Sequence, residues 1–405
     1  MIQYKFVIKL LAAVAVFSML SVITANAAIG DLNAASKTIS GNARSVAAPP
    51  VQWEQTFGGS VGNSSGRGVQ QTTDGGYIIV GDSFGAAKGG IYLVKTDSFG
   101  KVQWRQTFGG SKQDIGKGVQ QTTDGGYIIV GQTDAFSAGK LKAYLIKTDS
   151  SGTKQWQQTY GGNPLNYGRF VQQTTDGGYI LVGTTFADKT LLIYLVKTDS
   201  SGKVQWEQTF GSGVQNTGTS VQQTTDGGYI ITGTTIQSAD QAYAYLVKTD
   251  SSGRVQWEQT FGGKGISIGM SVQQTKDSGY VIGGVTNSSG AGKQHFYLVK
   301  TDSSGTKQWQ QTFGGNGDDI AYAVRQTIDG GYIMVGETDS FTANQSQVYL
   351  VKSNSSGSMQ WQETFGGSGN SIGSDVQQTN DGGYIVVGST ETGHAGRLDV
   401  YLAKL

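Results

Sequence analysis

The chain contains no cysteine among its 405 residues. Disulfides, thiolate metal sites and a lipid-bearing cysteine are therefore excluded, and stability must come from packing. Only three prolines stand against 63 glycines, a balance that suits short strands joined by tight turns. A formal net charge of +1 gives no overall field to attract nucleic acid or an anionic membrane. We therefore expect no nucleic acid partner.

One long hydrophobic run is present, and it lies at the amino terminus. The apolar segment 10–23 follows two lysines and precedes the small-x-small pattern Ala25-Asn26-Ala27. This pattern predicts a secretory signal peptide over residues 1–27. A flexible leader rich in Ala, Ser and Asn is expected over 28–50. An uncleaved anchor is the alternative, but the run is shorter than the about 20 residues that a span needs. We expect a secreted, periplasmic or surface protein without stable membrane insertion.

Seven tryptophans mark a sequence repeat with a period of about 51 residues, typical of stacked supersecondary units. They are Trp53, Trp104, Trp156, Trp206, Trp257, Trp309 and Trp361. Each repeat holds four short segments with strand character. In the second repeat these segments begin at Val119, Tyr127, Ala143 and Lys154. An Asp-Gly pair separates the first two segments and predicts a hairpin turn in which both central residues favour positive φ.

The two ends of the repeat region decide between a ring and an open stack. Val51–Phe57 has the character of a fourth strand with no preceding three, and the last repeat stops at its third strand, Val400–Leu405. The first segment can therefore complete the last sheet and leave only short protected edges. We predict an all-β fold over 51–405, a seven-bladed β-propeller of four-stranded antiparallel blades. An open solenoid is the alternative.

The repeat motif resembles that of secreted bacterial and archaeal β-propeller repeat proteins. Their units read D-G-G-Y, then Y-L-V-K-T-D-x-x-G, then Trp, as in the first repeat here from Asp74 to Trp104. The resemblance covers 51–405 and implies an exported or surface protein of this fold, with interaction as its expected role. A looser likeness to the Asp-box turn of sialidase-type propellers carries no activity over, because the Asp-to-Gly spacing is one residue longer here.

The predicted connectivity gives the ring two unlike faces. The D-G-G and D-x-x-G turns repeat almost unchanged on one face, which we call the constant face. The loops after the second and fourth strands differ between repeats and form the variable face, where function is expected. Aromatic residues interrupt the repeat on these variable segments. Some of them must belong to the core, and the others suggest a sugar-stacking or partner-binding patch. They are Tyr167, Phe170, Phe186, Tyr243, Phe296, Tyr322 and Phe341.

One position of the repeat predicts a ligand site at the mouth of the central channel. It lies two residues before the first strand's valine and reads Arg67, Lys117, Arg169, Thr219, Met270, Tyr322 and Ser374. The residue at this position is basic on three adjacent blades, which favours binding of an anion or acidic sugar. Met270 and Tyr322 would supply apolar contacts on the opposite side. Alternatively, the long cations only fill and solvate the rim.

Other recurring or charged residues are better explained by structure than by chemistry. Seven lysines hold equivalent places on the third strand, and an Asp lies two residues after five of them. They suggest cross-strand partners on an exposed outer strand. These lysines are Lys95, Lys147, Lys197, Lys248, Lys300, Lys352 and Lys404. The tryptophans fit packing between blades. We expect no metal site, because His295 and His394 are a blade apart. The carboxylates Asp114, Asp318, Asp319 and Asp375 lack a calcium-loop pattern.

The sequence contains no recognisable catalytic motif. We therefore expect a monomeric, non-enzymatic exported scaffold without cofactor that binds protein or glycan at the cell surface through its variable face. The rival interpretation is a polysaccharide hydrolase or lyase at the channel mouth, since fold alone does not exclude it. A glycosidase would require two carboxylates about 5 to 9 Å apart.

Overall fold

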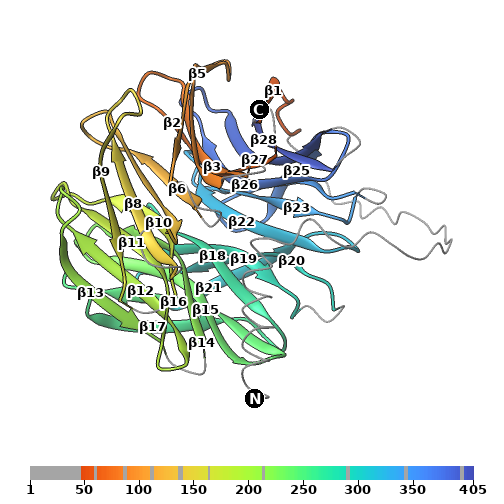
Figure 1. Ribbon diagram of the computed structural model, residues 1–405. Helices are drawn as coiled ribbons and strands as arrows, with labels where there is room; N and C mark the ends of the chain where they lie inside the picture. The colour runs from red at the N-terminus through yellow and green to blue at the C-terminus, as the bar shows by residue number, and fades with distance from the viewer. Residues whose placement is uncertain are drawn as a thin grey trace. The chain divides into compact units, whose positions relative to one another are not determined.

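The computed structural model describes residues 47–58, 62–84, 89–109, 114–135, 140–162, 165–211, 215–288, 292–341, 345–392 and 396–405. Within these ranges the chain forms seven four-stranded antiparallel sheets, the blades of a β-propeller (Figure 1). The fold class predicted from the repeat is confirmed. The predicted signal peptide and residues 28–46 of the predicted leader lie outside the described residues. In the described part of the chain, no helix is long and apolar enough to cross a membrane.

Blades 1 to 6 run from an innermost to an outermost strand in chain order, and blade 7 takes its outermost strand from the start of the chain. Blade 1 consists of β2 (Asn63–Gln71), β3 (Tyr77–Phe84), β4 (Gly89–Thr96) and β5 (Val102–Phe108). Blade 2 consists of β6 (Ile115–Gln121), β7 (Tyr127–Thr133), β8 (Lys142–Thr148) and β9 (Lys154–Tyr160). Blade 3 consists of β10 (Asn166–Gln173), β11 (Tyr179–Ala187), β12 (Thr190–Thr198) and β13 (Val204–Phe210).

The remaining blades repeat this plan. Blade 4 consists of β14 (Gln215–Gln223), β15 (Tyr229–Ser238), β16 (Gln241–Thr249) and β17 (Val255–Phe261). Blade 5 consists of β18 (Ser267–Gln274), β19 (Tyr280–Thr286), β20 (His295–Thr301) and β21 (Lys307–Phe313). Blade 6 consists of β22 (Asp319–Gln326), β23 (Tyr332–Thr338), β24 (Gln347–Ser353) and β25 (Met359–Phe365). Blade 7 consists of β26 (Ser371–Gln378), β27 (Tyr384–Thr392), β28 (Arg397–Lys404) and β1 (Trp53–Phe57).

Blade 7 closes the ring with strands from both ends of the propeller sequence. β1 pairs antiparallel with β28, with Trp53 opposite Lys404. The same register places Trp104 opposite Lys95 within blade 1. The first strand therefore takes the position that the fourth strand holds in every other blade, as the sequence predicted.

The hydrophobic core is divided into seven clusters, and each lies between two neighbouring blades. The tryptophan of each outer strand packs on the tyrosine that begins the second strand of the next blade, with ring centroids 5.7 to 6.0 Å apart. Trp206 also contacts the turn residue Gly253 of blade 4, where a Cβ would lie 2.7 Å from the indole ring. The predicted role of the tryptophans in packing between blades is confirmed.

Paired glutamines at the end of six of the seven inner strands bind neighbouring blades to one another. The Gln172 Oε1 atom of blade 3 accepts a 2.6 Å hydrogen bond from the Gln223 backbone N–H of blade 4. In return, Gln223 Oε1 accepts a 2.9 Å bond from the Thr175 N–H of blade 3. The first bond recurs at six of the seven blade junctions and the second at all seven. The sequence analysis did not predict this function for the Gln-Gln repeat.

The D-G-G turns differ from the predicted Asp-Gly hairpin. In blade 4 the Gly227 N–H donates to Thr224 O, the Thr224 N–H donates to Gly228 O, and Gly227 has φ +82°. Asp226 is not among the described residues with positive φ. The connection is therefore a longer turn in which one residue, Gly227, is left-handed. The carboxylate of Asp226 stabilises this turn by accepting hydrogen bonds from Thr224 Oγ1 and the Gly228 N–H.

The recurring lysines are buried, which corrects the prediction of an exposed outer strand. Lys248 is 3 % exposed and pairs at 2.8 Å with Asp226 of the D-G-G turn, not with the Asp two residues further on. Its ammonium also donates to Thr249 O and Gln256 Oε1. The expected structural role holds, but the third strand is interior because the fourth strand covers it.

Blade 5 carries a serine where the other D-G-G turns have left-handed glycine. Ser278 has φ +66°, a conformation that costs a side-chain-bearing residue about 1–2 kcal/mol. Ser278→Gly should raise the free energy of unfolding by about 0.5 kcal/mol or more, since the greater freedom of glycine in the unfolded chain offsets part of the gain. Urea unfolding measures this change. Gly227→Ser is the reciprocal control and should destabilise; an unchanged or lower stability of Ser278→Gly would contradict the account.

The ion pairs between buried lysines and solvent-exposed aspartates predict a loss of stability in acid, which solvent screening of the aspartates reduces. Burial alone would raise the pKa of Asp226, but hydrogen bonds from Lys248, Thr224 and Gly228 outweigh it and lower the pKa to about 2. The same value is found at five other D-G-G turns. Because an unfolded Asp titrates near pKa ~4, the stabilisation is complete above that pH and is lost as pH falls towards 2.

The free energy of unfolding should therefore fall steeply between about pH 4 and pH 2. Lys248→Met should lessen the fall, because Asp226 then loses a partner that lowers its pKa. Urea titrations at a series of pH values test this. A free energy that stays constant over that window would refute the contribution of the pairs.

Candidate functional site

Every inner strand contains a β-bulge, and the extra residue of each bulge is a member of the predicted channel ring. In β2 the pairing with β3 shifts between Gly66 and Gly68, which leaves Arg67 without an opposite residue. The other six inner strands shift at the equivalent place and leave Lys117, Arg169, Thr219, Met270, Tyr322 and Ser374. A bulge redirects a side chain and increases the local twist. Here it turns one residue of each blade into the channel.

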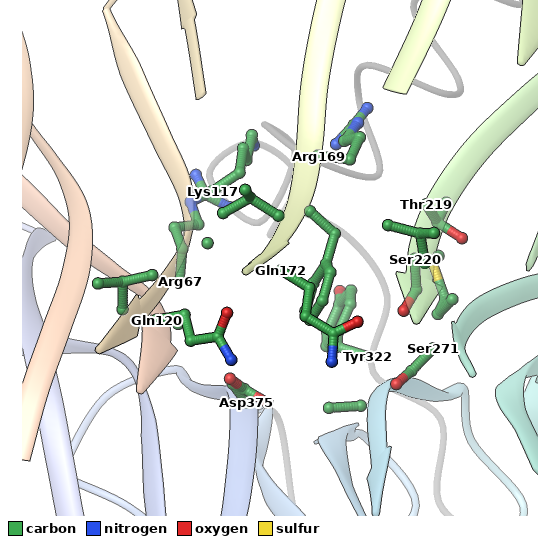
Figure 2. A pocket seen from close by; sticks show the side chains of 18 of the residues that line it. Arg67, Lys117, Gln120, Arg169, Gln172, Thr219, Ser220, Ser271, Tyr322 and Asp375 are labelled. Atoms are coloured by element: carbon green, nitrogen blue, oxygen red, sulfur yellow. The ribbon is translucent and has the colours of Figure 1, made fainter. Parts of the chain in front are cut away.

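The seven bulge residues line one cavity of about 280 Å³ on the inner strands. The five predicted ligand-contacting residues, Arg67, Lys117, Arg169, Met270 and Tyr322, are therefore brought together. They are half-buried and lie in mid-strand, inside the channel and not at its mouth as predicted. Figure 2 shows Arg67 and Lys117 side by side, with Thr219 and Ser220 across the cavity.

Crowding at the centre of the ring explains the glycine before most bulges. A Cβ on Gly116 would lie 2.7 Å from the carbonyl oxygen of Gly81 in the preceding blade. Gly168 is in the same position against Gly131, at 2.6 Å. The inner strands approach closely because these positions lack a side chain, and the next residue, at the bulge, extends into the channel.

Two of the five predicted residues are already bound to their own blade. The Arg67 Nε atom lies 3.0 Å from the carboxylate of Asp82, which is 1 % exposed. The Tyr322 hydroxyl donates a 2.6 Å hydrogen bond to Glu337. Burial raises the pKa of Glu337 to about 7, although the bond from Tyr322 opposes this shift. Asp82 and Glu337 hold equivalent positions on the second strand of their blades.

The other two basic residues have no such partner. Among the described residues, neither the Lys117 ammonium nor the Arg169 guanidinium forms a hydrogen bond or ion pair. Burial lowers the pKa of Lys117 well below its ordinary value, and the charges of Arg67 and Arg169 lower it further. Burial and Arg67 also lower the pKa of Arg169. The Asp82 carboxylate opposes the lowering of the Lys117 pKa, but neither Lys117 nor Arg169 has a carboxylate within ion-pairing distance among the described residues.

An ion pair that the sequence did not predict links blades 6 and 7 at the cavity. Arg325 occupies the place of the first glutamine in blade 6 and binds Asp375 of blade 7 at 2.9 Å. Its guanidinium also donates to Ser271 Oγ and Val324 O. Burial raises the pKa of Asp375, although Arg325 opposes the shift. The replacement of Q-Q by R-Q in this repeat was the available sequence signal.

The carboxylates considered as calcium ligands are dispersed. Asp375 is the one carboxylate among the described residues that line the cavity. Asp319 is buried and accepts bonds from Thr338, Ser340 and the Gly315 N–H. His295 lies 3.5 Å from Asp319, and His394 is outside the described residues. No group of three His, Cys, Asp or Glu side chains able to hold a metal occurs in the described ranges.

The interrupting aromatics do not form one patch. Phe296 is in the core against Tyr349, with ring centroids 4.7 Å apart, and Phe170 packs on the cluster between blades 3 and 4. Tyr322 lines the channel. Phe341 is 43 % exposed on the variable face, and Tyr167, Phe186 and Tyr243 are half-buried.

Comparison with family models agrees with this repeat architecture. The model described as outer membrane protein assembly factor BamB matches residues 41–226 and, in a second overlapping match, 192–390. The chain belongs to this family. Two overlapping matches are expected when a family model is compared with a repeat protein. Because the blades have similar sequences, the model can align with them in more than one register. Among curated proteins no sequence matches the chain.

Solved structures share the fold of this BamB-type chain at low sequence identity. An inactive virginiamycin B lyase from Staphylococcus aureus with quinupristin is 12% identical, with a TM-score of 0.56, and the match covers 87% of this chain and 99% of the lyase. The Pan2 WD40 domain of Neurospora crassa is 10% identical, with a TM-score of 0.52 over 85% and 89%. YCF48 bound to D1 peptide is 11% identical, with a TM-score of 0.52 over 90% and 99%. These likenesses establish the fold alone.

Proposed function

We propose that this protein is an exported, non-enzymatic scaffold that binds protein or glycan at the cell surface through its variable face. The observation that carries the proposal is the chemical difference between the two faces. The polar groups of the constant face bind one another in the Lys–Asp pairs and the turns. The variable face carries unlike loops, with Phe341 exposed on blade 6 and the exposed Lys293 of blade 5 at 3.6 Å from Asp318.

The composition of the channel favours binding over hydrolysis. Glycosidases need two carboxylates, and the described lining residues supply Asp375 alone, which is engaged by Arg325. The printed names of similar structures include a peptide complex and a lyase, so both classes occur on the fold. The family description, an outer-membrane assembly factor, supports export, as does the predicted signal peptide.

Matched substitutions on the two faces of blades 5 and 6 test the proposal. The variable-face variant is Lys293→Glu with Phe341→Ser, and the constant-face control is Lys276→Glu with Ile328→Ser. Ligands found with glycan and peptide arrays should bind the variable-face variant at least about tenfold more weakly, a change of ~1.4 kcal/mol. The control should bind them normally.

Two results would oppose the proposal. One is an equal loss of binding in the constant-face control, and the other is unchanged binding in the variable-face variant. Release of sugar fragments from a polysaccharide by the purified protein, abolished in Asp375→Asn, would instead establish the enzymatic alternative.

A further inference from the structure

The glutamines of the inner strands present their amide nitrogens to the channel. Gln172 Oε1 accepts the backbone N–H of Gln223 at 2.6 Å. Because a backbone N–H can only donate, this bond fixes which end of the amide is oxygen. The Nε2 group is then the free end. Figure 2 shows Gln120 and Gln172 extended into the cavity.

Six glutamines share this arrangement. They are Gln70, Gln120, Gln172, Gln222, Gln273 and Gln377, and all six line the cavity. Their Nε2 groups have no acceptor among the described residues. Arg325 completes the ring with a guanidinium, which is also a donor only. The lining therefore has N–H donors from every blade. Those of Arg325 already bind Ser271, Val324 and Asp375, whereas the six glutamine Nε2 groups have no acceptor among the described residues.

Lys117 and Arg169 add charge to this donor ring. Their positive charges are not paired, in contrast to Arg67 with Asp82 and Arg325 with Asp375. An unpaired charge in a confined site costs free energy that a bound counter-ion would offset. The ligand that matches such a lining is an acceptor with negative charge, and hydrogen bonds to charged groups are the stronger ones.

We propose that the central channel binds an oxyanion group, a sulfate, phosphate or carboxylate of a small ligand, through Lys117, Arg169 and the glutamine amide nitrogens. The cavity of about 280 Å³ accommodates a free inorganic oxyanion or the body of one acidic sugar. It is near the lower end of the about 300–1,000 Å³ of small-molecule pockets. This inference goes beyond the proposed function, because it holds even if no macromolecule reaches the channel.

Isothermal titration of the purified full chain with sodium sulfate, sodium phosphate and a free hexuronic acid tests the inference, with glucose as the neutral control. At least one anion should bind and glucose should not. Binding should weaken as salt rises and as pH rises, because deprotonation of Lys117 removes a charge. If the uronate binds more tightly than the inorganic ions, the carboxylate of a sugar is the preferred source. The reverse order identifies a free oxyanion.

Two variants separate the site from general charge effects. Lys117→Met with Arg169→Met should weaken anion binding at least about tenfold, while the exposed constant-face pair Lys203→Met with Arg254→Met should leave it unchanged. The variant Gln172→Glu keeps an oxygen that can accept the Gln223 N–H. It replaces the amide nitrogen that faces the channel with a negatively charged oxygen, so it should abolish anion binding.

Thermal unfolding provides a second measurement that also reports whether each variant folds. The anion should raise the Tm of the wild-type chain by mass action but not that of Lys117→Met with Arg169→Met. Without anion, this double variant should be at least as stable as wild type, because a repulsive pair has been removed. Absence of binding by all three anions at concentrations up to about 10 mM, roughly 10⁴-fold above a micromolar Kd, overturns the inference. So does binding that survives the channel substitutions, and neither result depends on the variable-face variants.

Discussion

Closure of the ring by β1 against β28 is the constraint on which the rest of the structure depends. Each hydrophobic cluster lies between two blades, so an open ring would leave the apolar face of blade 1 and that of blade 7 exposed to water. Closure also sets the geometry of the centre. Seven inner strands must converge there, and their convergence requires glycine at positions such as Gly116, whose neighbour Gly81 leaves no room for a Cβ.

The chemistry of the channel follows from that convergence. Because the inner strands are too crowded to carry side chains at every position, the bulge residue and the first glutamine are the main groups that reach the lumen. The glutamine oxygens are used in holding the blades together, which leaves nitrogen donors facing inwards. One set of hydrogen bonds thus links neighbouring blades and at the same time leaves amide nitrogens facing the channel.

The sequence predicted those features that depend on period and on local pattern. The tryptophan spacing indicated seven blades, and the incomplete repeats at the two ends indicated closure. The position of Arg67, Lys117 and Arg169 in the repeat indicated that they share a site. The sequence did not reveal that Lys248 is buried, because its partner Asp226 is 22 residues away across a hairpin. Nor did it show that Asp82 neutralises Arg67, because a bulge sets that pairing and no local pattern marked it.

A circular permutation tests closure most directly. The segment Val51–Gly58 is moved from the start of the propeller to a position after Leu405, joined by D-S-S-G-K, the turn that connects the equivalent strands at residues 199–203. The permuted chain should unfold cooperatively with a Tm within a few degrees of wild type, a difference of about 1 kcal/mol or less. A chain from which the segment is simply deleted should lose cooperative unfolding. A deletion variant as stable as the wild-type chain would show that the ring does not depend on β1, and would contradict the account.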